Sequence, residues 1–170
     1  MSKTVFKYCP MCATPLHEVQ HTGHMRMVCD QCGFVQWGNP VPVVAALVEY
    51  QGKILLARNV AWPAHFYALI TGFLERDETP ESGAIRELKE ETNLDAVHSE
   101  LIGVYPFPMK NEVIMAYYVK AEGRVELSEE LADYKLVDPA QLRPWRMGTG
   151  LAMADWLLAR QLPVNWIELK

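Results

Sequence analysis

The chain has 170 residues, of which 50% are hydrophobic and 22% are charged, and its formal net charge is −5. This length suffices for one well-packed core and a small appendage, and no apolar stretch of the sequence approaches the roughly 20 residues that a membrane-spanning helix requires. The negative charge argues against a general nucleic-acid binder, and it predicts that an anionic substrate is repelled unless a cation binds first.

Four cysteines near the start of the chain form two Cys-x-x-Cys pairs, within the segments CPMCAT and CDQCGF. Two such pairs separated by a longer loop are typical of a structural zinc site with four thiolate ligands. One alternative is a disulfide or redox pair, but the opening residues MSKTVFKYCP contain no apolar signal segment, so we expect a reducing, cytoplasmic location. Another is a nucleic-acid-binding ribbon, although Arg26 is the only Lys or Arg between the first and last cysteine. The expected zinc ligands are Cys9, Cys12, Cys29 and Cys32.

A turn-forming cluster, WGNP at residues 37–40, separates the cysteine segment from the rest of the chain. We therefore expect a zinc ribbon over residues 1–38 and a second domain over residues 39–170. The second domain opens with VPVVAALVEY and KILLAR on either side of a Gln-Gly turn, a pattern that predicts a buried β-hairpin over residues 41–58. After a central loop and helix, we expect strands at 98–105, 112–120 and 134–137 and helices at 139–142 and 149–162.

The central segment GFLERDETPESGAIRELKEETNL, residues 72–94, is rich in carboxylates. A helix beginning near Thr79 places three glutamates, spaced i, i+3 and i+4, on one face. Like charges on one face repel each other, and oxygen donors at this density suit Mg²⁺ or Mn²⁺. The alternative is a solvated helix in which Arg86 and Glu90 form an ordinary ion pair. The expected metal ligands are Glu87, Glu90 and Glu91.

This segment resembles the signature of the Nudix hydrolases: Gly72, five residues, Glu78, seven residues and then Arg-Glu-Leu-Lys-Glu-Glu-Thr-Asn-Leu. The departure is Asn93, where the family has Gly, and Asn is the next-best residue for the left-handed conformation that ends a helix. The resemblance implies an α/β fold with a mixed β-sheet between helices. It also implies metal-dependent hydrolysis of a phosphoanhydride, in which bound cations neutralise the diphosphate and orient a water molecule.

The resemblance assigns roles to individual residues around the carboxylates. Arg86 is expected to hold Glu87 in place, Glu78 to support the loop before the helix, and the carbonyl of Thr71 to complete the metal shell. Gly72 is expected to let the loop approach the diphosphate closely, with an ordinary turn glycine as the alternative. The residues implied as catalytic are Arg86, Glu87, Glu90 and Glu91.

The acid that orients or deprotonates the water is left open by the sequence. In the family this base is often a carboxylate in a loop far from the signature, and the stretch from Glu130 resembles the place where a further metal-linked acid is often found. The candidates are Glu112, Glu129, Glu130 and Asp133.

The substrate class rests on a second likeness. A four-cysteine ribbon, the signature and the run Tyr-Pro-Phe-Pro at residues 105–108 are together similar to the NADH pyrophosphatases, although Ile-Gly-Val-Tyr stands here in place of that subfamily's Ser-Gln-Pro-Trp. The likeness implies a nucleoside diphosphate linked to another moiety, such as NADH, FAD or ADP-ribose. Tyr105 and Phe107 are candidates for stacking on the substrate, and equally for core aromatics.

Two further functions remain open, namely hydrolysis of nucleoside triphosphates or capped RNA, and ligand sensing by a Nudix domain that binds without cutting. Sensors tend to lose signature carboxylates, whereas all are present here, and no basic patch supports an RNA substrate. We expect a small-molecule nucleotide as the partner, with neither a membrane nor a nucleic acid. A homodimer is an open alternative, because dimers are common in the family.

Overall fold

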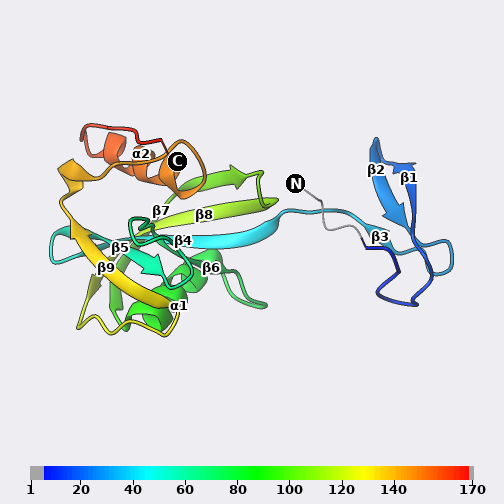
Figure 1. Ribbon diagram of the computed structural model, residues 1–170, viewed down its shortest axis with the longest axis horizontal. Coiled ribbons are helices and arrows are strands. Elements are labelled where there is room, and N and C mark those ends of the chain that lie inside the picture. Colours follow the sequence, from blue (N-terminus) through cyan, green and yellow to red (C-terminus); the bar gives the residue numbers. More distant parts are fainter. Residues whose placement is uncertain (1–5, 169–170) are drawn as a thin grey trace. The chain divides into compact units, whose positions relative to one another are not determined.

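The computed structural model describes residues 6–168 of the chain (Figure 1). The first five residues, on which the expectation of a missing signal segment partly rests, lie outside the described residues, as do the last two. The chain divides into two compact units at the junction of Pro40 and Val41. The assignment of these units as separate domains stays a prediction. No helix within the described part is long and apolar enough to cross a membrane.

The first unit contains a small antiparallel sheet in the order β1-β2-β3. Its strands are short, and β1 pairs with β2 along its whole length. The buried side chains of this unit are few and centre on Cys9, Leu16 and Cys29, so there is little apolar core to hold the sheet together. The strands are β1 (His17–His21), β2 (His24–Val28) and β3 (Val35–Gln36).

The second unit is a mixed sheet between two helices, as predicted (Figure 1). The strand order is β7-β8-β4-β5-β9, with β6 paired to β4; the β4–β8 pair is parallel and the other pairs are antiparallel. Helices α1 and α2 cover opposite faces. The elements are β4 (Val41–Tyr50), β5 (Lys53–Asn59), β6 (Ile70–Phe73), α1 (Pro80–Thr92), β7 (Asp95–Phe107), β8 (Glu112–Glu122), β9 (Leu131–Val137), the 3₁₀ turn η1 (Pro139–Gln141) and α2 (Thr149–Ala159).

Alternation along β4 divides the core of this unit between the two faces. Val48 belongs to the cluster that packs on Leu88 of α1, whereas Leu47 belongs to the cluster that packs on Met153 and Leu157 of α2. Successive side chains of a strand point to opposite faces, so β4 is buried on both sides. This double burial explains why its sequence reads as a nearly continuous apolar run.

The predicted hairpin, the later strands and the last helix are confirmed with modest differences in length, whereas the expected helix at 139–142 is a three-residue 3₁₀ turn. The expected strand at 98–105 extends over Asp95–Phe107, and the last helix ends at Ala159 instead of residue 162. The sequence does not predict strand β6, because the signature segment has the pattern of a loop and a helix. The strand has only four residues and contains a glycine, and such a strand leaves a weak periodic signal.

Candidate active site

The ends of helix α1 are well defined, and they fix the register of its carboxylates. Thr79 is the N-cap: its hydroxyl accepts a hydrogen bond from the Ser82 N–H at 3.2 Å, and its own N–H donates to Ser82 Oγ at 2.9 Å. At the other end, Asn93 has the left-handed conformation (φ 60°, ψ 6°), and its N–H donates to the carbonyl of Lys89. The predicted start near Thr79 and the use of Asn93 in place of glycine are both confirmed.

Arg86 connects the carboxylates of this helix to each other and to strand β6. Its Nε and Nη2 donate to the two carboxylate oxygens of Glu78 at 3.0 and 2.8 Å. Its Nη1 donates to Glu87 and to Glu90, in both cases at 2.8 Å. Nη2 also donates to the backbone carbonyl of Phe73 at 3.0 Å. The ion pair of Arg86 and Glu90 therefore exists within a larger cluster rather than as an isolated surface contact.

Glu78 fastens the loop between β6 and α1. Besides its two contacts with Arg86, its Oε1 accepts the backbone N–H of Glu75 at 2.6 Å. The hydrogen bonds from Arg86 are the main cause that lowers the pKa of Glu78 to about 2, so this carboxylate stays charged at any ordinary pH. Gly83 on α1 leaves room for it, since a Cβ atom there would lie 2.9 Å from Glu78 Oε1.

Gly72 gives Glu87 its position. It lies on β6 opposite Val44, and a Cβ atom at Gly72 would lie 1.9 Å from both Cδ and Oε1 of Glu87. Its φ is not positive, so glycine is required here for space rather than for backbone freedom. The neighbouring Thr71 pairs with Ala45 in the same ladder, and its expected contribution of a carbonyl ligand stays a prediction.

The electrostatics of the cluster favour a divalent cation. Burial, followed by the charges of Glu87, Glu130 and Glu90, raises the pKa of Glu91 to about 8. Burial also raises the pKa of Glu87, against the opposing effect of Arg86. Mutual repulsion between neighbouring carboxylates is relieved by a bound cation, and an all-oxygen donor set is the one that Mg²⁺ and Mn²⁺ prefer. The donor chemistry suits such an ion, but among the described residues only the four cysteines form a group of three or more possible ligands within 4.8 Å of one another, so Glu87, Glu90 and Glu91 as ligands stay a prediction.

Of the four acids considered as the base, Glu130 is the one whose charge acts on the cluster. It contributes to the raised pKa values of both Glu87 and Glu91. It lies directly before β9, and its backbone carbonyl accepts the N–H of Val60 at 2.9 Å, which holds the chain in place there.

The other three acids have different surroundings. Asp133 accepts a hydrogen bond from the Tyr67 hydroxyl at 2.6 Å, and this contact is the main cause that lowers its pKa. Glu112 begins β8, where it pairs with Phe107. Glu129 is exposed next to Glu130.

The structure does not bring the two predicted substrate aromatics to the carboxylates. Tyr105 is only 8% exposed, packs against Ala152 of α2, and donates a hydrogen bond to Asp155 Oδ2 at 2.7 Å. Phe107 packs at the edge of the same cluster. Both rings therefore lie on the α2 side of the sheet, and their substrate role stays a prediction.

Phe73 is an exposed aromatic residue near the Arg86 cluster that the sequence did not single out. Its ring is 59% exposed, it directly follows Gly72, and its carbonyl binds Arg86. Phe73 pairs with Val43, which packs in the same cluster as Tyr105, so its side chain lies on the face of the sheet opposite to Glu87. The signal was present in the sequence, because Phe73 adjoins the first glycine of the signature.

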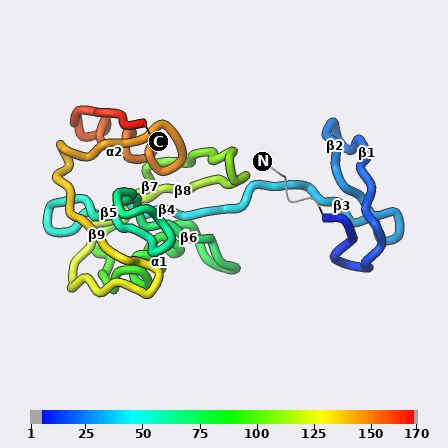
Figure 2. The backbone as a smooth tube through the Cα atoms, viewed as in Figure 1, coloured from blue at the N-terminus to red at the C-terminus, as the bar shows by residue number. Residues whose placement is uncertain are grey.

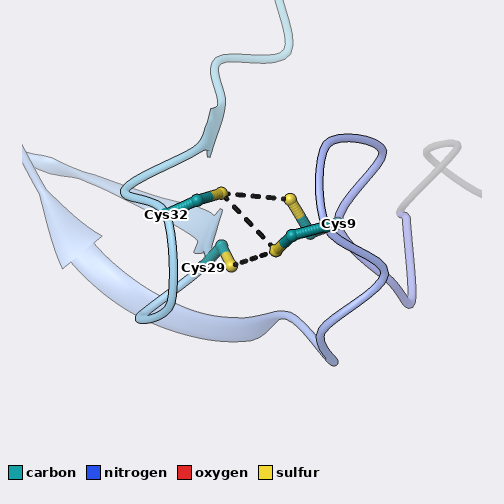
Figure 3. Close-up of side chains that lie close together, drawn as sticks. Cys9, Cys29 and Cys32 are labelled. Carbon is teal, nitrogen blue, oxygen red and sulfur yellow. Dashed lines mark hydrogen bonds between the residues drawn. The ribbon is translucent and has the colours of Figure 1, made fainter.

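The four cysteines of the first unit converge from two similar turns (Figure 3). In each turn the N–H of the fourth residue after the first cysteine donates to that cysteine's carbonyl at 2.9 Å, and these residues, Ala13 and Gly33, both have positive φ. The sulfur atoms lie 3.5 to 3.6 Å apart in the three close pairs. Sulfurs 2.3 Å from a tetrahedral zinc ion would lie about 3.8 Å apart, so the cluster could hold a metal of this kind.

The comparisons with known proteins agree with this geometry. The sequence model of the NUDIX domain matches residues 38–156. The chain is 31% identical over 147 residues to a protein of Vibrio vulnificus named NAD-capped RNA hydrolase NudC, an alignment that covers 85% of this chain and 55% of that protein. It is 28% identical over 160 residues to the protein of the same name from Pseudomonas aeruginosa, covering 91% of this chain and 56% of that one. The chain thus spans about half the length of the curated relatives it matches.

Solved structures show the same fold. The crystal structure of a NUDIX hydrolase from Nitrosomonas europaea has a TM-score of 0.71 and 23% identity, and covers 95% of this chain and 99% of that chain. That of an ADP-ribose pyrophosphatase from Streptococcus suis has a TM-score of 0.57 and 17% identity, and covers 76% of this chain and all of that one (100%).

The second unit is an α/β domain, a mixed sheet between two helices, in which Arg86 holds carboxylates on one of the helices. Since the family model matches more than half of the chain, the protein belongs to the NUDIX domain family. The family resemblance and the fold class inferred from the sequence are therefore confirmed.

Proposed function

We propose that this protein is a metal-dependent pyrophosphohydrolase that cleaves a nucleoside diphosphate linked to another moiety into two monophosphate products. The class includes dinucleotides and nucleotide sugars such as NADH, FAD and ADP-ribose. The observation that carries the proposal is the position of Glu87, which is held by Arg86 on one side and lies against Gly72 on the other. A carboxylate constrained in this way is pre-organised for a function beyond solubility.

Glu87, Glu90 and Glu91 would hold Mg²⁺ or Mn²⁺, which when bound neutralises the diphosphate oxygens and polarises the phosphorus. Arg86 acts through the ligands, because it orients Glu87 and Glu90 by hydrogen bonds. Glu78 in turn holds Arg86 and the loop that follows Gly72. These contacts would keep the proposed ligands in place before the substrate arrives. Such positioning and electrostatic preorganisation supply most of the rate enhancement in phosphoryl transfer.

Glu130 is the proposed base. Its carboxylate would take a proton from water while the water oxygen bonds to one phosphorus and the bridging P–O bond breaks. The support for this role is electrostatic, because Glu130 is the acid outside α1 whose charge raises the pKa of both Glu87 and Glu91. A positioned general base contributes typically 10² to 10⁴ in rate.

Phe73 is the proposed stacking residue for a ring of the substrate, because its side chain is 59% exposed and its backbone carbonyl joins it to the Arg86 cluster. We retain Tyr105 and Phe107, which lie on the same face of the sheet as Phe73, as weaker candidates because Tyr105 is buried and Phe107 packs against the core. The cysteine cluster is proposed to bind a structural zinc ion and so to make residues 1–38 a zinc ribbon domain. The small apolar core of the first unit supports this role. So few buried side chains give little folding energy by themselves, and a bound metal ion would supply the rest.

Capped RNA is a second candidate substrate, and it is favoured by the names of the curated relatives. The net charge of −5 disfavours a long nucleic-acid footprint, but a capped 5′ end also carries a diphosphate linkage. The two candidates share the same proposed carboxylate chemistry and differ in what flanks the bond.

The test is a product screen with Mg²⁺ or Mn²⁺ on NADH, FAD, ADP-ribose, NAD-capped RNA and nucleoside triphosphates. We expect two monophosphate products from at least one compound with a diphosphate link. Glu130→Gln should lower turnover by at least about 100-fold, whereas the adjacent Glu129→Gln is the matched control and should not. Release of inorganic diphosphate from triphosphates alone would replace the proposed substrate class, and no hydrolysis of any compound would leave the binding-only alternative.

A further inference from the structure

A cavity lies apart from the carboxylates, on the side of the sheet where β9 leads towards α2. Its volume is about 470 Å³, within the range of about 300 to 1,000 Å³ that small-molecule sites occupy. Strands β5 and β9, the segment before β6 and the connection after β9 form its walls, and the path of that connection can be followed in Figure 2. We call it the β9 pocket. The lining residues used below are Leu56, Phe66, Tyr67, Lys135, Gln141 and Arg143.

The β9 pocket faces away from helix α1. Leu56 on its floor belongs to the core cluster of α2, whereas its strand neighbours Leu55 and Ala57 belong to the cluster that contains Leu88 of α1. Lys135 pairs with Leu56 across β5 and β9, so it lies on the same face as Leu56. The carboxylates of α1 are therefore on the other side of the sheet.

Two cations in the pocket lack an acidic partner. Between residues 6 and 168, neither Lys135 nor Arg143 forms an ion pair. Lys135 is instead held over the ring of Tyr67, with its ammonium 4.5 Å from the ring centroid. Glu168 also lines the pocket, but its carboxylate lies 3.7 Å from Arg146, outside the lining. The pocket thus presents net positive charge in a protein whose net charge is −5.

The aromatic walls are fixed before any ligand binds. The hydroxyl of Tyr67 donates to Asp133 at 2.6 Å, which holds the ring at the pocket edge. Phe66 packs on Trp62 and Trp145, with centroid distances of 5.0 and 6.0 Å. Rigid rings lose little entropy when a planar ligand packs on them. The amide of Gln141 adds one donor group and one acceptor next to these rings.

We propose that the β9 pocket binds a nucleoside monophosphate. The phosphate pairs with Lys135 and Arg143, the base lies against Phe66 and Tyr67, and the Gln141 amide contacts the edge of the base. Cations and fixed aromatic rings around one cavity match a ligand that joins an anionic group to a planar ring. This site needs no divalent metal, and its occupancy does not depend on the proposed hydrolytic activity.

The test is titration calorimetry of AMP into the full-length protein without added Mg²⁺ or Mn²⁺. No chelator is used, so that the cysteine cluster keeps any metal it holds. In this state the carboxylates of α1 repel a phosphate, which leaves the β9 pocket as the binding site. We expect saturable binding of one AMP per chain, with adenosine and inorganic phosphate each at least tenfold weaker.

Arg143→Gln and Lys135→Gln should each weaken AMP binding at least tenfold. The matched control is Arg124→Gln, an exposed arginine outside the pocket, which should bind AMP as the wild type does. Hydrolysis of the preferred diphosphate substrate with Mg²⁺ should be unchanged in Arg143→Gln. Absence of saturable binding, equal losses in Arg124→Gln and Arg143→Gln, or phosphate binding as tight as AMP binding would overturn the proposal. A parallel loss of hydrolysis would overturn it too, because the pocket would then belong to the substrate site.

Discussion

Replacing Gly72 by alanine tests whether the position of Glu87 matters. The added Cβ would lie 1.9 Å from the carboxyl carbon of Glu87, whereas non-bonded carbons prefer about 3.5 Å or more. The carboxylate must therefore retreat by about 1.5 Å, or β6 must shift by a similar distance. Because Glu87 is also held by Arg86, either movement disturbs the hydrogen bonds of that guanidinium.

The size of the effect follows from this displacement. A misplacement of about 1 Å in a reacting group can lower a rate by about 100-fold, so Gly72→Ala should reduce turnover by at least that factor. Overpacking typically costs about 1 to 3 kcal/mol of stability. Thr79→Ala is the control that distinguishes the loss of turnover from the loss of stability. Loss of this N-cap costs about 1 kcal/mol of stability without moving Glu87.

The assay combines hydrolysis of the preferred diphosphate substrate at saturating Mg²⁺ with Mn²⁺ affinity and thermal unfolding. Gly72→Ala should lose turnover and metal affinity, whereas Thr79→Ala should lose stability alone. If Gly72→Ala kept wild-type turnover, Glu87 would not need its observed position, and the reasoning from the close contact would be wrong.

Three other predictions address the remaining features. Without added divalent metal, burial and neighbouring acids hold the pKa of Glu91 at about 8, so the folded protein keeps a proton that the unfolded chain releases near its ordinary pKa of 4.5. The free energy of unfolding should therefore fall as the pH rises from about 5 to 8, by at most about 1.4 kcal/mol per pH unit. Thermal unfolding of Glu91→Gln should lack this pH dependence. An unchanged pH dependence in the variant would contradict the assignment of the raised pKa to Glu91. Cys29→Ser should lower the zinc content from about one ion per chain and unfold the first unit, whereas the second unit should keep its unfolding transition. Metal analysis that finds no zinc in the wild-type protein would refute the zinc site. Phe73→Leu should raise KM more than it lowers kcat, whereas Tyr105→Leu should lower thermal stability with unchanged kinetics; the reverse pattern would return the substrate role to Tyr105.

The sequence predicted the local chemistry of the signature well, because its information is contained in short spacings. Helical periodicity alone places Glu87, Glu90 and Glu91 on one face, and the N-cap and the left-handed Asn93 follow from residue preferences at helix ends. The cysteine pairs are similar, since each pair shares one turn. The spacing of the two pairs also predicted that all four cysteines meet in one site, and the structure brings them together.

The contacts that depend on the sheet could not be predicted. No sequence spacing indicates that Gly72 faces Glu87, because this contact arises when β6 pairs with β4 beneath α1. The same holds for Tyr105, whose strand position determines that it points towards Asp155 on α2. Glu130 lies far along the chain from the signature, and its electrostatic effect on Glu91 became visible only in the folded structure.

The most direct test of the central claim is the turnover of Glu91→Gln at saturating Mg²⁺. The amide keeps the shape of the side chain but removes a ligand charge, so the proposed diphosphate hydrolysis should fall by several orders of magnitude, about 10³ or more. Thermal stability without added divalent metal should stay level with the wild type at about pH 5 and exceed it increasingly towards pH 8, because the wild type must protonate Glu91 to fold, whereas the amide carries no charge in either state. Near-wild-type turnover in this variant would contradict the account and would assign this helix to binding rather than hydrolysis.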